Sequence, residues 1–344
     1  MLFRSLLRNG GEVTTTATLG ATTIREPIPH LLADGEGKNI AWLVREHAMT
    51  VLPAVSSLKA LRQFAKQSHA SEPYIGFGNP LLDGEPEKFK GDGPAAKLAR
   101  EKRCDPTLRP GAASLLRLRG GSLAMTRSNG GIVDVADIRH WAPLPETADE
   151  LCDVANDLGA DPKTHLYLGA MATETEIKRL SEDGTLKKYR TVHFATHGAV
   201  AGQVSRTSEP GLLLTPPNVP SESDDGYLSA SEITSLKLDA DWVILSACNT
   251  AAGDAKGAES LSGLARAFFY AGARSLLVSH WEVASEPTVK LITKAVDELK
   301  RDPKIGRAEA LRRSMLSMID TGKDEAHPAF WAPFVLVGEG GAAR

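Results

Sequence analysis

Stretches of consecutive apolar residues are the clearest pattern along the chain. A first short run covers residues 74–78, and later runs are HLYLG (165–169), TVHFAT (191–196), WVIL (242–245), SLLVS (275–279) and FVLVG (334–338). Because such runs lack polar alternation, they are typical of strands buried on both faces of a mostly parallel sheet, with helices on each side. The pattern therefore predicts an α/β fold in three layers.

Segments with apolar residues at helical spacing lie between these runs. They predict helices at about 146–156, after 173, after 229, at 261–271, from 285 and at about 307–319. Two of the starts carry capping residues, Thr173 with Glu176 and Ser229 with Glu232. The regular alternation of strand and helix supports a mostly parallel sheet.

The first 145 residues are patterned more weakly. A β-type run is predicted around 47–52 and a helical segment at 56–64, while residues 80–145 are rich in Gly, Pro and charge and predict a long insertion with one or two short helices. We expect a single domain over 39–340, because its strands are spread over that whole range. Residues 1–38 would be a degraded N-terminal part of the same domain.

Composition and charge exclude several classes of function. Lys and Arg number 40 against 43 for Asp and Glu, so nothing attracts the chain to nucleic acid or to an anionic membrane. No apolar run is long enough to span a bilayer or to form a signal peptide. The chain has no Walker A loop and no GxSxG motif, and Pro80 after GFGN suits a turn better than a dinucleotide site. We expect no cofactor.

The chain has three cysteines, Cys104, Cys152 and Cys248, at wide spacing. An odd number at such spacing argues against a disulfide framework and against a four-ligand zinc site. The expected location is the reducing cytoplasm, with Cys104 an incidental thiol and Cys152 a core residue. No metal site is predicted, and His193, four residues before His197, is interpreted as a strand histidine with a satisfied hydrogen bond.

Two predicted strands end on residues that can do chemistry. His197 follows VHFAT, and Cys248 follows WVILSA. If the two strands are neighbours, about 5 Å separates their axes, and an imidazole and a thiol can meet just past their carboxyl ends. A thiolate would attack a carbonyl carbon while the histidine takes the proton, and the amides of Gly198 and Cys248 could bind the resulting oxyanion. The alternative is that Cys248 is a small buried apolar residue.

Acidic residues follow Cys248 closely. Asp254 and Glu259 could line a substrate pocket that favours Arg or Lys before the cut, or they could be solvent-exposed, with Glu259 at the start of its helix. His280 and His327 are interpreted as structural.

Longer motifs point to a known family. His197 precedes Cys248 by 51 residues, and caspase-like proteases carry their histidine about 50 residues before the cysteine. HFATHG, LSACNT, GAESLSGLARAFFYAGARSLLVSHWEV and HPAFWAPFVLVG together resemble the CHAT domain, a caspase- and separase-related branch of the caspase-like cysteine peptidases. The likeness extends upstream through WLVREHAMTVLPAVSSLKALR, GFGNP and LPETADEL, so it covers about residues 39–338.

The resemblance implies a caspase-like three-layer α/β/α sandwich and hydrolysis of peptide bonds through an acyl-enzyme. It places His197 on the general base, Cys248 on the nucleophile and Gly198 on the oxyanion-hole residue. The chain departs from the family pattern in its weak N-terminal segment, in the absence of the helical repeats that often precede the domain, and at His280, where an apolar residue is more usual.

Two hypotheses follow for the function. The first is a cysteine endopeptidase that cuts a protein or peptide substrate under the control of a partner, for which a helical-repeat protein is one candidate. The second is a catalytically silent signalling module that acts by protein association. Neither hypothesis involves nucleic acid or a membrane.

Overall fold

The computed structural model describes residues 40–52, 68–84, 94–101, 104, 132–204, 207–246, 263–280, 285–321 and 324–341. Its centre is a six-stranded sheet in the order β2-β1-β3-β7-β8-β9. The strands are β1 (Glu72–Gly78), β2 (Leu166–Leu168), β3 (Tyr189–Ala195), β7 (Trp242–Leu245), β8 (Ser275–Ser279) and β9 (Phe334–Gly338). Pairing is parallel from β2 to β8, and β9 runs antiparallel to β8. The predicted mostly parallel sheet is confirmed.

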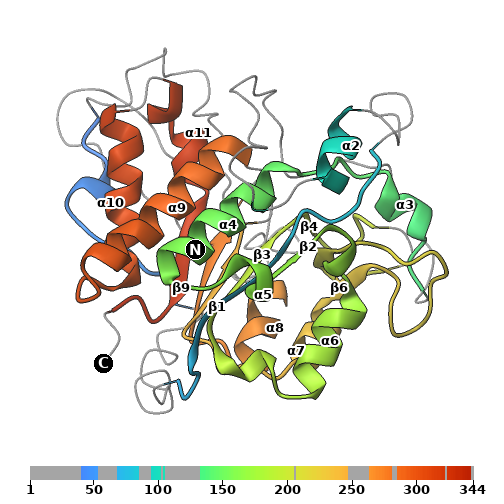
Figure 1. Ribbon diagram of the computed structural model, residues 1–344. Helices are drawn as coiled ribbons and strands as arrows, with labels where there is room; N and C mark the ends of the chain where they lie inside the picture. Colours follow the sequence, from blue (N-terminus) through green and yellow to red (C-terminus); the bar gives the residue numbers. More distant parts are fainter. Residues whose placement is uncertain are drawn as a thin grey trace, which may run out of the picture.

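Helices cover both faces of this sheet (Figure 1). One layer contains α4 (Glu146–Leu158), α9 (Ser285–Arg301) and α10 (Gly306–Thr321), and the other contains α6 (Glu174–Glu182), α7 (Ala230–Ser235) and α8 (Gly263–Ala271). Two separate apolar cores result, because alternate residues of each strand face opposite layers. Phe194 and Leu245 face the layer of α8, whereas Ala195 and Ile244 face the layer of α4.

Local sequence explains where these helices begin and how closely they pack. Ser229 and Glu232 form a complete capping box at the start of α7, and the Thr173 side chain accepts from the Glu176 amide at the start of α6. Gly78 allows α4 to approach β1, because a Cβ there would lie 2.7 Å from both Leu151 and the Ala195 carbonyl oxygen.

A second, three-stranded sheet follows β3 directly. It pairs β4 (Gly198–Ala199), β5 (Gly211–Leu213) and β6 (Tyr227–Ser229) antiparallel. The sequence at 205–226 is rich in Pro and Ser and predicts a loop, but the structure has the strand β5 within it, so that prediction is wrong for residues 211–213. Conversely, the predicted β-type run at 47–52 is wrong as a strand, since it contributes only an isolated bridge between Val51 and Val337. The predicted helical segment at 56–64 lies outside the described residues.

Shorter elements complete the described fold. The long insertion contains α2 (Pro94–Glu101) and α3 (Val135–Arg139). The remaining helices are η3 (Leu43–Arg45), α5 (Pro162–His165), η5 (Gly169–Met171), η6 (Leu186–Lys188), η7 (Asp324–Ala326) and α11 (Pro328–Trp331). Within the described ranges, no helix combines the length and the apolar character that crossing a bilayer would require.

One expectation about the cysteines is wrong. Cys104, just after α2, forms a disulfide with Cys152 on α4, with 5.6 Å between the two Cα atoms. Wide spacing in the sequence does not prevent pairing, because the fold brings the insertion against α4. The argument for a reducing compartment rested on unpaired cysteines, so it loses that support.

Candidate active site

His197 lies just past the carboxyl end of β3, in the turn that leads into β4. The side chain is almost fully buried, with 1 % of the residue exposed. Its ring Nε2 lies 2.7 Å from the backbone oxygen of Ala142, and its ring centroid is 5.1 Å from that of Trp141. The segment between α3 and α4 therefore holds the imidazole in place.

The contact with Ala142 determines which ring nitrogen of His197 is basic. A carbonyl oxygen can only accept a hydrogen bond, so Nε2 carries the hydrogen and donates it. In the neutral ring the lone pair is then on Nδ1. A general base is commonly oriented by a third group in this way, and at His197 such a role would use Nδ1.

The second sheet fixes the backbone around His197. The carbonyl of His197 accepts from the Leu213 amide at 3.0 Å, and the Thr196 hydroxyl donates to the Leu213 carbonyl. Gly198, the predicted oxyanion-hole residue, pairs with Leu212 in the β4–β5 ladder. The strand β5, which the sequence did not reveal, thus clamps the predicted base on its main-chain side.

The other predicted site residues are Cys248, Asp254 and Glu259, and they lie outside the described residues. On this side of the sheet the described chain runs through β7 to Ser246 and resumes at Gly263. The structure therefore places His197 and Gly198 and leaves the predicted nucleophile and pocket residues as predictions.

His193 is fully buried in the middle of β3 and has partners on both ring nitrogens. Nδ1 lies 2.9 Å from the Tyr74 hydroxyl, while Nε2 lies 3.0 Å from the Ser246 hydroxyl and 3.0 Å from Glu150 Oε1. The interpretation of His193 as a hydrogen-bonded strand histidine is confirmed. Among the residues that the structure describes, no group of three or more His, Cys, Asp or Glu side chains is arranged to hold a metal ion.

Sequence reasoning missed several of these contacts. Trp141 and Ala142 belong to the predicted insertion. Ala142 contacts His197 through its backbone oxygen, which every residue has, so the sequence carries no signal for this contact. Glu150 lies within LPETADEL and Ser246 within LSACNT, two motifs that carried the family resemblance, so a signal existed for both. Their pairing through His193 depends on the arrangement of α4, β3 and β7.

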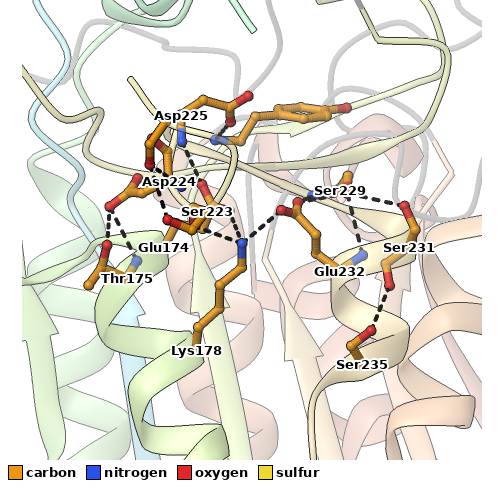
Figure 2. Close-up of polar contacts among 12 residues, drawn as sticks. Glu174, Thr175, Lys178, Ser223, Asp224, Asp225, Ser229, Ser231, Glu232 and Ser235 are labelled. Atoms are coloured by element: carbon orange, nitrogen blue, oxygen red, sulfur yellow. Dashed lines mark hydrogen bonds and ion pairs between the residues drawn. The ribbon is translucent and has the colours of Figure 1, made fainter. Parts of the chain in front are cut away.

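A cluster of charged residues connects α6, α7 and the loop before β6 (Figure 2). Lys178 donates to Glu174, to Glu232 at 2.7 Å and to the Ser223 carbonyl at 2.8 Å. Glu174 also accepts from the Asp225 amide at 3.0 Å. Burial raises the pKa of Glu174 to about 8, against the opposing hydrogen bond from Lys178.

This cluster holds the loop before β6, a strand of the second sheet. Thr215 attaches the second sheet to the main sheet. The Thr215 hydroxyl donates to the Gly169 carbonyl at 2.7 Å and accepts from the Leu81 amide at 2.8 Å, and its own amide donates to the Ala172 carbonyl. These contacts fix the β5–β6 connection over the carboxyl ends of β1 and β2. Since β5 also contacts His197, the position of the base depends on this support.

Two other histidines were interpreted as structural. His327 caps α11, where its Nδ1 accepts from the Ala329 amide at 3.2 Å, so that interpretation is confirmed. His280 follows β8 and its amide donates to the Pro333 carbonyl at 3.0 Å. Burial lowers the pKa of the His280 ring, which favours its neutral form.

A mostly parallel sheet between two helical layers, with an oriented histidine at its carboxyl edge, defines a three-layer α/β/α protein. The model of the CHAT domain family matches residues 27–339, and the chain belongs to this family. The resemblance to the CHAT domain seen in the motifs is confirmed, and so is the three-layer α/β/α sandwich with a mostly parallel sheet.

Curated relatives match over part of the chain. Tetratricopeptide repeat protein 28 of Mus musculus is 28% identical over 229 residues, which covers 58% of this chain and 9% of that protein. Tetratricopeptide repeat protein 28 of Homo sapiens is 25% identical over 229 residues, covering 58% of this chain and 8% of that protein. The chain thus spans less than a tenth of the length of these relatives.

Solved structures show a more distant likeness. The Arg specific cysteine proteinase gingipain R (RGPB) aligns with a TM-score of 0.40 and 12% identity, covering 63% of this chain and 45% of that chain. The complex of the pro- and mature domains of RgpB from Porphyromonas gingivalis aligns with a TM-score of 0.39 and 11% identity, covering 63% and 46%.

Proposed function

We propose that this chain is a cysteine endopeptidase in which Cys248 is the nucleophile and His197 the general base. The observation that carries the proposal is the orientation of His197 at the carboxyl end of the central strand, with Nε2 bound to the Ala142 carbonyl at 2.7 Å. This contact leaves Nδ1 as the nitrogen that can accept a proton. Membership in the CHAT family adds to this support.

The strand register supports the pairing of the two residues. In the parallel ladder between β3 and β7, His193 is matched with Ile244 and Phe194 with Leu245, an offset of 51 residues. His197 and Cys248 are also 51 residues apart in the sequence. Both residues follow the carboxyl ends of these adjacent strands, whose axes lie about 5 Å apart, and this supports a pairing of the two side chains.

The proposed reaction proceeds through a thioester. His197 Nδ1 takes the proton of the Cys248 thiol, and the thiolate sulfur bonds to the scissile carbonyl carbon. The C–N bond then breaks, and the leaving amine takes the proton from His197. Water, deprotonated by the same ring, attacks the thioester and releases the carboxylic acid and the thiol. In this proposal the amides of Gly198 and Cys248 bind the oxyanion.

Substrate choice and regulation are further parts of the proposal. An acid at Asp254 or Glu259 would favour Arg or Lys before the cut, because opposite charges pair in a partly desolvated pocket. The substrate is a protein or peptide segment, and a partner protein controls access to the site.

Active-site labelling tests the proposal. Because Cys104 and Cys152 are bonded to each other, Cys248 is the remaining cysteine of the three. A lysyl or arginyl acyloxymethyl ketone should add once to the unreduced wild type at Cys248, and His197→Ala should slow this by at least about a hundredfold. A proteome-derived peptide digest should show new cuts with wild type and none with Cys248→Ala. Equal cutting by both proteins would contradict the proposal.

A silent signalling module is the second candidate, and one observation favours it. His197 is 1% exposed and Trp141 beside it is 3% exposed, so the base is covered in this structure. The same labelling separates the two functions. In a silent module, iodoacetamide would modify Cys248 while the peptidyl ketone would not, because no substrate cleft would present the thiol to a peptide.

A further inference from the structure

A group of buried polar side chains surrounds His193, which lies on β3 four residues before His197. Tyr74 on β1, Glu150 on α4, His193 on β3 and Ser246 after β7 are all fully buried. Alternate residues of a strand share a face, so His193 lies on the same side of β3 as Ala195, in the layer covered by α4. Four buried polar groups from four elements are costly unless they are fully hydrogen-bonded.

The contacts at the His193 ring are directional. The Tyr74 hydroxyl lies 2.9 Å from Nδ1, and burial together with the nearby Glu150 carboxylate raises the pKa of Tyr74. The phenol therefore keeps its proton and donates it to Nδ1. The ring hydrogen is then on Nε2, which faces the Ser246 hydroxyl at 3.0 Å and Glu150 Oε1 at 3.0 Å.

Ser246 is bound to β3 through its amide and its hydroxyl. The amide donates to the Phe194 carbonyl at 3.1 Å, which extends the β3–β7 ladder by one residue. The hydroxyl accepts from His193 and donates to the same Phe194 carbonyl at 3.5 Å. In the sequence, Ser246 stands two residues before Cys248. Glu150 Oε1 lies 3.0 Å from Nε2, so its negative charge favours the ring form that carries the hydrogen on Nε2, where it points at Ser246.

We propose that Glu150 and His193 are positioning residues that act through Ser246 on the nucleophile. This inference rests on the proposed function, because it assumes that Cys248 works with His197. Glu150 fixes the His193 ring, the ring fixes Ser246, and Ser246 sets the end of β7 from which the chain continues to the thiol. Neither Glu150 nor His193 touches the substrate. Loss of either link lets the thiol move away from His197, and its pairing with the imidazole weakens.

Iodoacetamide alkylation of Cys248 tests this, measured against pH on the unreduced full-length protein. The variants are Glu150→Gln, which keeps the shape of the side chain, and Ser246→Ala. The matched control is Ser314→Ala, because Ser314 is also fully buried and its hydroxyl also donates to a backbone carbonyl, that of Leu291 on α9, at 2.6 Å. Thermal melting of every variant is measured in parallel.

The wild type should show a Cys248 thiol pKa below the free value of about 8.5. In Glu150→Gln and Ser246→Ala the inflection should move toward about 8.5, with alkylation near neutral pH about tenfold slower for each unit of that shift. Ser314→Ala should lose similar thermal stability and keep the wild-type inflection. The inflection of the double variant Glu150→Gln/Ser246→Ala should shift by less than the sum of the two single shifts, because both substitutions act through His193.

Two failures are distinguishable. If wild type and His197→Ala share an inflection near the free-thiol value, the Cys248–His197 pair is absent and the proposed function fails with it. If the wild-type inflection is depressed and His197→Ala abolishes the depression, while Glu150→Gln and Ser246→Ala behave like Ser314→Ala, the dyad stands and the positioning role is refuted. Should Ser246→Ala not fold, Glu150→Gln decides the question.

Discussion

The disulfide between Cys104 and Cys152 should contribute a large part of the stability of the fold. The sequence separation of the two residues is 48, so reduction releases a long closed loop in the unfolded chain. By the loop-entropy relation, closing a loop of this length is worth about 4 kcal/mol at 25 °C. Typical domains are stable by only about 5–15 kcal/mol, so the loss would be substantial.

Replacing either cysteine by serine removes the disulfide, and Cys104→Ser is the better choice. Cys104 is half-buried, whereas Cys152 is 3% exposed and would place a serine hydroxyl in the core. With an unfolding entropy of about 2.1 cal/mol/K per residue over the 344 residues, a loss of about 4 kcal/mol lowers the melting temperature by about 5 °C. The remaining Cys152 thiol behaves as a small apolar residue.

Urea unfolding of wild type and Cys104→Ser, each with and without a dithiol reductant, measures the effect. Reductant should lower the wild-type midpoint to that of the variant and leave the variant unchanged, and Cys248→Ser should respond like wild type. The reasoning is refuted if oxidised wild type and Cys104→Ser unfold at the same midpoint. It is also refuted if the unreduced, unfolded wild type exposes three titratable thiols instead of one.

Two further predictions concern a buried carboxyl and a strained glycine. Burial raises the pKa of Glu174 from 4.5 to about 8, so its contribution to stability is complete below about pH 4.5 and is lost as pH rises through 8. The urea midpoint of wild type should therefore fall more between about pH 5 and about pH 9 than that of Glu174→Gln, and parallel curves would contradict this. Gly272 has φ +113° and a Cβ there would lie 2.3 Å from the Leu238 carbonyl oxygen, whereas Gly159 has φ +75° and open space around it. Gly159→Ala should lower the free energy of unfolding by about 1 kcal/mol. Gly272→Ala should lower it by about 3 kcal/mol or more. Urea unfolding measures both, and equal midpoints for the two variants would refute the steric argument.

Much of the fold could be predicted because its main signals are local. The Ser229–Glu232 capping box and the apolar run of β7 depend on residues close together in the chain, and both are present in the structure. The direction of β9 could not be predicted, since an apolar run reads the same in a parallel or an antiparallel ladder. The strand β5 was missed because three residues within a Pro-rich segment carry too little pattern to separate a strand from a loop.

In the candidate site, too, the features that depend on neighbouring residues could be predicted, and those that depend on the fold could not. His197 and Gly198 were predicted from their place after an apolar strand, and the structure puts them at the sheet edge. The Ala142 carbonyl could not be predicted, because every residue has one and only the fold selects which oxygen meets the ring. The spacing argument for Cys104 and Cys152 failed for a similar reason, because distance along the chain says little about distance in the folded protein.

The two histidines of HFATH show why neighbours decide the role of a residue type. Both are buried on β3 or just past it, four residues apart. At His193 the Tyr74 hydroxyl lies at Nδ1 and Nε2 faces Ser246 and Glu150, so the ring connects β1, α4 and the end of β7 to β3. At His197 the Ala142 carbonyl accepts from Nε2, so the ring is oriented by the segment before α4. The same residue type thus holds the interior of the sheet together at one position, and at the other its orientation is set by a segment outside the sheet.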